Sequence, residues 1–268
     1  MVLMGSTILI YVNIVYILWE SCAMPRCEYI EEELKRISTE REGINHVFKA
    51  YLASLILGFI SIPFLIAATL SSATSEPSSA IATLLIGAGI IDLIIAAIVV
   101  PIMYKGFRLL AMASQDYGIG VTGTIIQGIG SVLSGIVLIV AGNHLANVLK
   151  GASAEEVSSA FLRLLAYIVL VSLISLIGGI MVLIALWRLG DAYPQYGGDV
   201  LKIGLVIWII GYALQVFQVR GGGLLALVGI LVLLYGLHRL REELGSLQGE
   251  KEYELERCRR EEAQNISG

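Results

Sequence analysis

Residues 104–130, YKGFRLLAMASQDYGIGVTGTIIQGIG, decide how this chain folds. Lys105 and Arg108 lie between a long apolar run and a second apolar run that is rich in glycine. Lys and Arg gather in the cytoplasmic turns of membrane proteins. The stretch therefore predicts the inner turn of a helical hairpin that crosses a membrane.

The composition of the whole chain supports the same class of protein. Hydrophobic residues make up 57% of the 268 residues, and the mean hydropathy is +0.82. Soluble domains have only about 45–50% apolar residues. Charged residues make up 15%, the formal net charge is −4, and no basic stretch indicates a nucleic-acid surface. We therefore expect an all-α polytopic transmembrane helical bundle, with the lipid bilayer as its first partner.

Six apolar runs approach the length of about 17–25 residues that a transmembrane helix needs. They cover residues 47–70, 80–104, 119–149, 160–187, 200–219 and 224–238. These six core spans form a predicted transmembrane domain over residues 47–238. Asp92, Pro63 and Pro101 interrupt the otherwise apolar character of the first two runs.

An aromatic residue or histidine, an arginine and a leucine recur after alternate spans. The triplets are Phe107-Arg108-Leu109, Trp187-Arg188-Leu189 and His238-Arg239-Leu240. Their spacing favours a chain of three repeated helical hairpins that point the same way. We expect Arg108, Arg188 and Arg239 to anchor the inner interface of the membrane. The ring before each arginine is expected at the depth of the lipid headgroups.

The two ends of the chain differ from the spans. Residues 1–23 are apolar, and three interpretations stay open: an upstream extension that the cell does not make, a seventh helix, and a cleaved signal. Residues 24–46 predict a cytoplasmic amphipathic helix, with a partner-docking helix as the alternative. Its apolar face carries Ile30, Leu34 and Ile37. Residues 239–268 predict a charged helical tail in the cytoplasm, for which a coiled-coil dimer is the alternative.

The basic residues predict the orientation of the chain. Fifteen of the eighteen Lys and Arg residues fall in segments that we place inside. Only Lys150, Arg163 and Arg220 fall in outer segments. Because positive charge marks the cytoplasmic side, we predict a multi-pass protein of the cell membrane with a cytoplasmic C-terminus.

The cysteines and histidines form no recognisable metal set. Cys22, Cys27 and Cys258 have no ligand spacing and no pairing pattern, so we interpret them as free thiols. His144 lies near the outer end of the third span, where an interfacial hydrogen bond is the plainer interpretation. We expect no metal and no cofactor.

Asp92 is the only acidic residue deep within a predicted span. A charge at that depth costs about 2.5–3.5 kcal/mol on insertion scales, so the residue must face a partner or a cavity. One interpretation is a protonated carboxyl that is hydrogen-bonded between helices, with Gln127 or Ser131 as its partner. The alternatives are an ion or proton site at the same three residues, and an oligomer contact.

The third span carries one row of small and polar residues at four-residue steps. The row contains Gly123, Gln127, Ser131, Gly135, Asn143 and Asn147, with Ile139 completing it. Such a row is expected to face protein or water instead of lipid. Residues 118–123 match G-x-G-x-x-G, but no strand precedes them, so they predict a close-packed helix start.

The residues Gly106-Phe107-Arg108-Leu109 and the YGIGVTG stretch at 117–123 resemble archaeal multi-pass membrane proteins of unknown function. The resemblance covers about residues 48–239 and leaves residues 1–23 without a counterpart. It implies an archaeal polytopic membrane protein, and it carries over no activity, cofactor or site residue.

The sequence contains no recognisable catalytic constellation, so we do not expect an enzyme. The leading hypothesis is a non-enzymatic scaffold or partner subunit that contacts a second copy or another membrane protein. The alternative is a small transporter or channel that uses Asp92 and the polar row of the third span. A transporter needs a polar path at Asp92, whereas a scaffold needs Asp92 sealed between helices.

Overall fold

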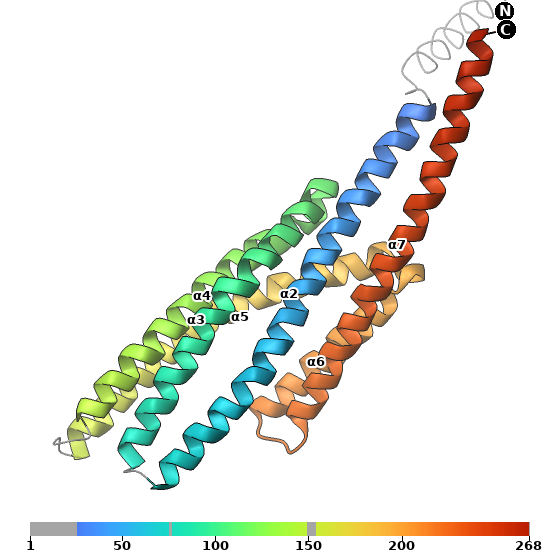
Figure 1. Cartoon of the computed structure of the whole chain (residues 1–268). Helices are drawn as coiled ribbons and strands as arrows, with labels where there is room; N and C mark the ends of the chain where they lie inside the picture. Colours follow the sequence, from blue (N-terminus) through green and yellow to red (C-terminus); the bar gives the residue numbers. More distant parts are fainter. Residues whose placement is uncertain (1–25, 75–76, 149–153, 268) are drawn as a thin grey trace, which may run out of the picture. The chain divides into compact units, whose positions relative to one another are not determined.

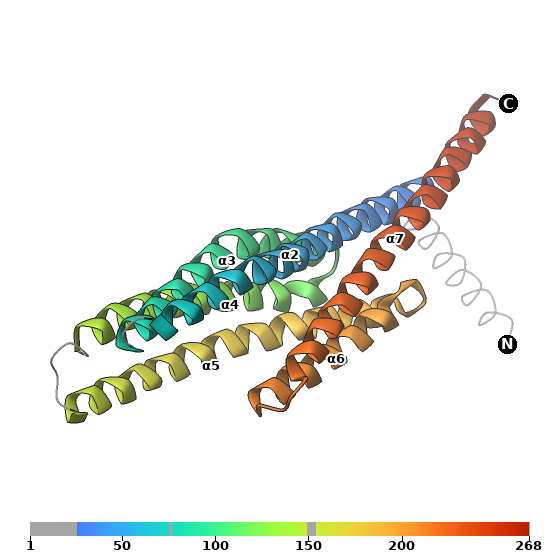
Figure 2. The ribbon, with the colours of Figure 1, turned by 60° about the horizontal axis from the view of Figure 1, so that its bottom comes forward.

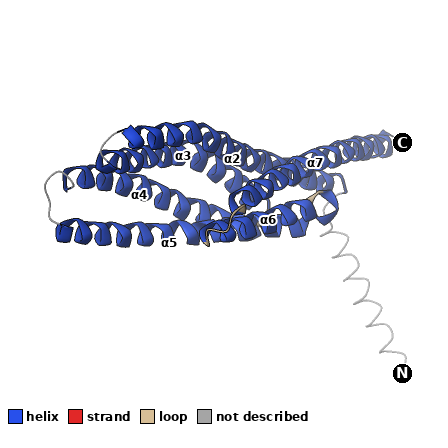
Figure 3. Ribbon diagram, turned by 90° about the horizontal axis from the view of Figure 1, so that it is seen from below, coloured by secondary structure: helices blue, strands red, loops and turns tan. Residues whose placement is uncertain are grey.

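The structure is a computed structural model that describes residues 26–74, 77–148 and 154–267 (Figure 1). All regular elements of these residues are helices, as the colouring in Figure 3 shows. The long helices are α2 (Arg26–Thr74), α3 (Pro77–Ala113), α4 (Gly118–Val148), α5 (Ala154–Ala192), α6 (Gly198–Val216) and α7 (Gly222–Ser267). Six described helices are long and apolar enough to cross a membrane. The predicted all-α helical bundle is confirmed.

Most of the long helices extend beyond the ends of the spans that the sequence predicted. The predicted amphipathic helix and the first span form one helix, α2, which continues through Pro63. The last span and the charged tail likewise form one helix, α7. The predicted connector at residues 71–79 is largely helical, because α2 continues to Thr74 and α3 begins at Pro77. Residues 1–23, with the candidate seventh helix and Cys22, lie outside the described residues.

The chain divides into two compact units. The larger unit contains Thr39–Leu244 and the smaller contains Met1–Ser38 with Gly245–Gly268. Within the described residues, the smaller unit therefore consists of the start of α2 and the end of α7.

In the larger unit, α3 lies beside α4 and α4 lies beside α5 (Figures 1 and 2). Glycines allow these helices to approach closely, as is common between membrane helices. A Cβ atom on Gly135 of α4 would lie 2.8 Å from the carbonyl oxygen of Gly89 on α3. A Cβ atom on Gly123 of α4 would lie 2.8 Å from the carbonyl oxygen of Gly178 on α5. The glycines of the third span therefore serve helix packing on both sides of α4.

The stretch at residues 104–130 contains the end of α3, a turn and the start of α4, so the predicted turn is present. A short 3-10 helix, η1 (Gln115–Tyr117), joins the two long helices, and the Ser114 hydroxyl accepts a hydrogen bond from the Asp116 backbone N–H at 3.4 Å. Residues 118–123, which match G-x-G-x-x-G, form the first turns of α4. They are a helix start, as the sequence predicted.

Phe107 packs inside the larger unit, and the depth of its ring in a membrane stays a prediction. Its side chain is 0% exposed and does not lie at the surface. A Cβ atom on Gly120 would lie 2.7 Å from Cε1 of the Phe107 ring, so the ring occupies the space that this glycine leaves on α4. Trp187, at the equivalent place in the second triplet, is 43% exposed. The two triplets therefore differ in environment, and the threefold hairpin repeat stays a prediction.

In the smaller unit, the start of α2 pairs with the end of α7 in antiparallel fashion. Ile30 and Leu255 are buried together with Cys27 and Cys258, and Leu34 packs against them. Ion pairs join the helices beside this cluster, with Lys251 Nζ 3.1 Å from Glu33 Oε2. Lys251 lies beyond the apolar part of α7. Its hydrogen bond to Glu33, and to a smaller extent its hydrogen bond to Glu254, raise the pKa of Lys251. The apolar face predicted for residues 24–46 is thus covered by the chain's own tail.

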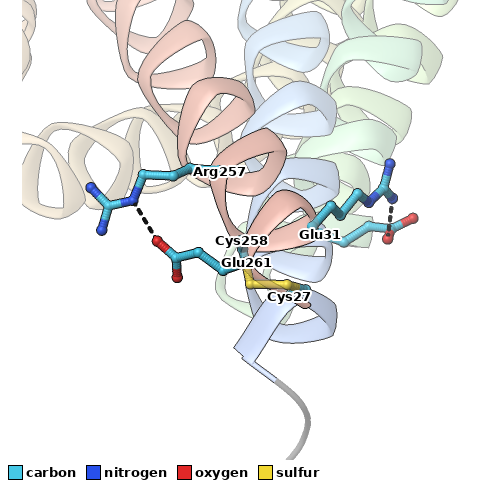
Figure 4. The surroundings of a disulfide bond; sticks show 6 residues. Cys27, Glu31, Arg257, Cys258 and Glu261 are labelled. Atoms are coloured by element: carbon cyan, nitrogen blue, oxygen red, sulfur yellow. Dashed lines mark hydrogen bonds and ion pairs between the residues drawn. A yellow bond between two sulfur atoms is a disulfide. The ribbon is translucent and has the colours of Figure 1, made fainter. Parts of the chain in front are cut away.

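The interpretation of the cysteines as free thiols was wrong for two of them. Cys27 and Cys258 form a disulfide with their Cα atoms 5.7 Å apart (Figure 4). The two residues are 231 positions apart in the chain. Sequence spacing could not reveal the bond, because only the pairing of the first and last described helices brings the sulfur atoms together.

Candidate functional site

Asp92 makes a hydrogen bond between two helices of the larger unit. The Ser134 hydroxyl of α4 donates to Asp92 Oδ2 of α3 over 3.0 Å. Both side chains are half-buried. The donor is therefore Ser134, and not Gln127 or Ser131 as considered from the sequence.

The helical geometry of α4 explains this difference. Residues four apart advance by about 40° around a helix of 3.6 residues per turn, so a row of such residues winds around the helix. Gly123 faces α5, whereas Gly135 faces α3, next to Asp92. Asn143 and Asn147, further along the row, are exposed. The predicted row is thus divided between two helix contacts, a cavity and the surface.

The middle of this row lines a cavity in the larger unit. The cavity has a volume of about 430 Å³ and takes lining residues from all six long helices. Gln127 and Ser131 lie on its wall, whereas Asp92 does not. The structure therefore separates the three residues that the sequence grouped into one candidate site. Gln127 and Ser131 belong to the cavity, and Asp92 belongs to the contact between α3 and α4.

The cavity wall is mostly apolar, with a few polar side chains. Leu, Ile and Val residues of α2, α3, α5 and α7 lie on it together with Phe59 and Met103. The polar side chains without a hydrogen bond to another described residue are Tyr51, Ser54, Gln127, Ser131 and Trp208. Thr124, in contrast, donates its hydroxyl hydrogen to the Gly120 carbonyl oxygen over 2.8 Å. The described residues of the wall carry no charge.

This wall combines a large apolar area with five neutral polar side chains that have no hydrogen bond to another described residue. Tyr51 and Trp208 offer donors, the serine hydroxyls offer donors and acceptors, and the Gln127 amide offers both. Ligand pockets in proteins have the same composition, and their volumes run from about 300 to 1,000 Å³. The signal was partly present in the sequence, since Gln127 is a polar residue in a span. Tyr51 and Trp208 were missed, because aromatic residues in spans have many roles.

The three predicted interface anchors have different contacts. The Arg188 guanidinium donates to the carbonyl oxygen of Asp116 over 3.0 Å and so ties α5 to the turn after α3. Arg239 pairs with Glu243 of its own helix at 3.7 Å. Arg108 is exposed. Their role at a membrane interface stays a prediction.

The sequence analysis did not predict the polar contacts around the turn between α5 and α6. Glu40 of α2 is only 4% exposed and accepts a hydrogen bond from the Tyr193 hydroxyl. Lys202 of α6 lies 2.8 Å from Asp191 of α5. These contacts hold the turn between α5 and α6. The partners are far apart in sequence or lie across a turn, so no spacing pattern indicated them.

Six apolar helices around a cavity suggest a multi-pass membrane protein. The chain belongs to a family described as protein of unknown function (DUF973), whose model matches residues 4–264. The match includes most of residues 1–23, for which the resemblance seen in the sequence had no counterpart. No curated protein and no solved structure matches this chain.

Proposed function

We propose that this protein is a non-enzymatic multi-pass protein of the cell membrane that binds a small, neutral, mostly apolar molecule between its spans. The observation that carries the proposal is the cavity of about 430 Å³, which all six long helices line. Five of its polar side chains have no hydrogen bond within the described part of the chain. A bound molecule with a hydroxyl, carbonyl or amide group would satisfy some of them.

The chemistry of the wall supports a neutral ligand. Burying an unpaired charge in an apolar site costs several kcal/mol, in the range that makes such a charge rare without a partner. The described residues of the wall offer no countercharge. A neutral molecule with an apolar body loses little on leaving the lipid and gains hydrogen bonds to groups such as the Gln127 amide.

The position of Asp92 supports a structural role for this residue. Its carboxyl is paired with Ser134 between two helices and lies outside the cavity wall. A transporter or channel that uses Asp92 stays the alternative. Proton flux into liposomes distinguishes the two: Asp92→Asn leaves any flux unchanged if the residue is structural. Loss of flux in that variant would support the alternative.

Other finer expectations stay predictions of the same proposal. They are a scaffold or partner-subunit role, the cell membrane as the location, the cytoplasmic C-terminus and an archaeal origin. A neutral ligand is compatible with a partner subunit, because occupation of the cavity would stiffen the packing of all the helices that line it.

Trp208 allows a direct test of ligand binding. Trp19→Phe and Trp187→Phe leave Trp208 as the only tryptophan, because the chain has 3 in total. A bromine atom quenches tryptophan fluorescence on contact, so 11-bromoundecanol serves as the neutral probe and 11-bromoundecanoate as its charged counterpart. We expect saturable quenching of Trp208 by the alcohol in detergent micelles and much weaker quenching by the carboxylate.

Matched glutamine variants provide the control. Gln127 lies on the cavity wall, whereas Gln215 is an exposed residue of α6 outside that wall. Gln127→Leu should weaken quenching by the alcohol, and Gln215→Leu should leave it unchanged. Quenching that does not saturate, or that responds equally to both variants, would show that the probe only partitions into the micelle.

A further inference from the structure

We infer that Cys27, Cys258 and Glu262 form a site for a divalent metal ion of the zinc class when the bond between the two cysteines is reduced. The site lies entirely within the smaller unit. One ligand atom from each residue lies within 4.8 Å of the other two. Cysteine thiolates and Glu carboxylates are both ligands of Zn²⁺, and a zinc site with three protein ligands keeps its fourth position for water.

The spacing of the two cysteines fits both a disulfide and a shared metal ion. Their Cα atoms are 5.7 Å apart. With Zn–S distances of about 2.3 Å, two thiolates on a tetrahedral ion lie about 3.8 Å apart. Rotation of the two reduced side chains about their Cα–Cβ bonds provides that separation. Neither helix has to move.

Glu262 supplies the carboxylate oxygen that lies within 4.8 Å of both sulfur atoms. It follows Cys258 by four positions, so both residues lie on the same side of α7. The carboxylate of Glu261 is paired with Arg257 at 3.1 Å, and that of Glu31 is paired with Arg259 at 2.9 Å (Figure 4). Glu262 has no ion pair or hydrogen bond to another described residue.

The surroundings of the thiols also suit a metal ion. Cys27 and Cys258 are 7% and 6% exposed, and Ile30 and Leu255 pack beside them. Glu262 is exposed, so an ion can enter from the solvent side. The apolar residues beside the thiols limit solvent access on that side, so water would reach the ion from the side of the Glu262 carboxylate.

The conversion between the two states balances in electrons and protons. A dithiol reductant gives two electrons and two protons to the disulfide. The S–S bond breaks, two thiols form, and the reductant closes a disulfide of its own. Zn²⁺ then replaces the two thiol protons, which pass to water. The ion thereby joins α2 and α7 at the place where the disulfide joined them, so the link persists in a reducing compartment.

Cobalt provides the test, because Co²⁺ bound to thiolates absorbs in the near ultraviolet. Full-length protein in detergent is reduced with a phosphine, freed of reductant without oxygen, and titrated with Co²⁺ and then with Zn²⁺. We expect one Co²⁺ per chain with a thiolate band, and displacement by Zn²⁺. Protein that keeps its disulfide should bind none.

Two neighbouring glutamates provide the matched variants. Glu262→Gln should weaken Co²⁺ binding at least about tenfold, the smallest loss that is usual even for an indirect partner of a metal ligand. Glu261→Gln should leave the affinity unchanged, and Cys27→Ser should remove tight binding. Both glutamates are exposed, so the helix content by circular dichroism should not change.

Three results would overturn the site. They are the absence of a thiolate band in reduced wild-type protein, equal affinities of the two glutamate variants, and wild-type affinity in Cys27→Ser. The test does not depend on the cavity proposal, because all three ligands belong to the smaller unit.

Discussion

At the scale of single residues, the hydrogen bond between Ser134 and Asp92 stabilises the contact between α3 and α4. Ser134→Ala removes the only hydrogen bond that the structure shows for the Asp92 side chain among the described residues. We expect the free energy of unfolding to fall by about 0.6–1.7 kcal/mol, which runs from the average to the largest value measured for hydrogen bonds between membrane helices. Titration with a denaturing detergent, followed by circular dichroism, measures the change.

Two variants control this measurement. Ser131→Ala removes a hydroxyl from the same helix, at a position that lines the cavity and makes no hydrogen bond to a described residue. Its unfolding free energy should stay near that of the wild type. Asp92→Asn keeps an oxygen that accepts from Ser134 and should also stay near it. Equal losses for Ser134→Ala and Ser131→Ala would contradict a structural role for the pair.

At the scale of elements, the glycines of α5 determine how closely it approaches α4. A Cβ atom on Gly178 would lie 2.7 Å from the carbonyl oxygen of Gly123, which is backbone and cannot rotate away. We expect Gly178→Ala to lower the free energy of unfolding by about 1–3 kcal/mol, the usual cost of overpacking. The same detergent titration measures it.

The next residue in the chain is the natural control. Nothing lies within 4 Å of a Cβ atom on Gly179. Gly179→Ala should therefore not destabilise the protein, because alanine also favours the helix over glycine. If both variants lost stability equally, the cause would be the methyl group itself and not the contact between α4 and α5.

At the scale of the whole molecule, one cut tests both the disulfide and the orientation. The turn between α6 and α7 contains Gly221, whose φ of 92° suits glycine and around which a Cβ atom would have open space. A protease site inserted after Gly221 separates Cys27 from Cys258. Protein purified in air without reductant should stay as one covalent species after cleavage and fall into two fragments on reduction.

The accessibility of that site reports the orientation. We predict the turn after Arg220 on the outer side, so protease added to intact cells should cleave it. Cleavage only after the cells are opened would reverse the predicted orientation. Fragments that separate without a reductant would show that the bond between Cys27 and Cys258 is absent from the purified protein.

The sequence by itself determined the class of fold, because burial in lipid requires long apolar helices and hydropathy measures this directly. It also located the turn at residues 104–130, where charge and glycine interrupt the apolar runs. Only the tertiary structure decided the partners: Ser134 for Asp92, and Cys258 for Cys27. Such pairs depend on the rotation of each helix about its axis and on which distant helices meet. Neither quantity leaves a periodic trace in a single sequence.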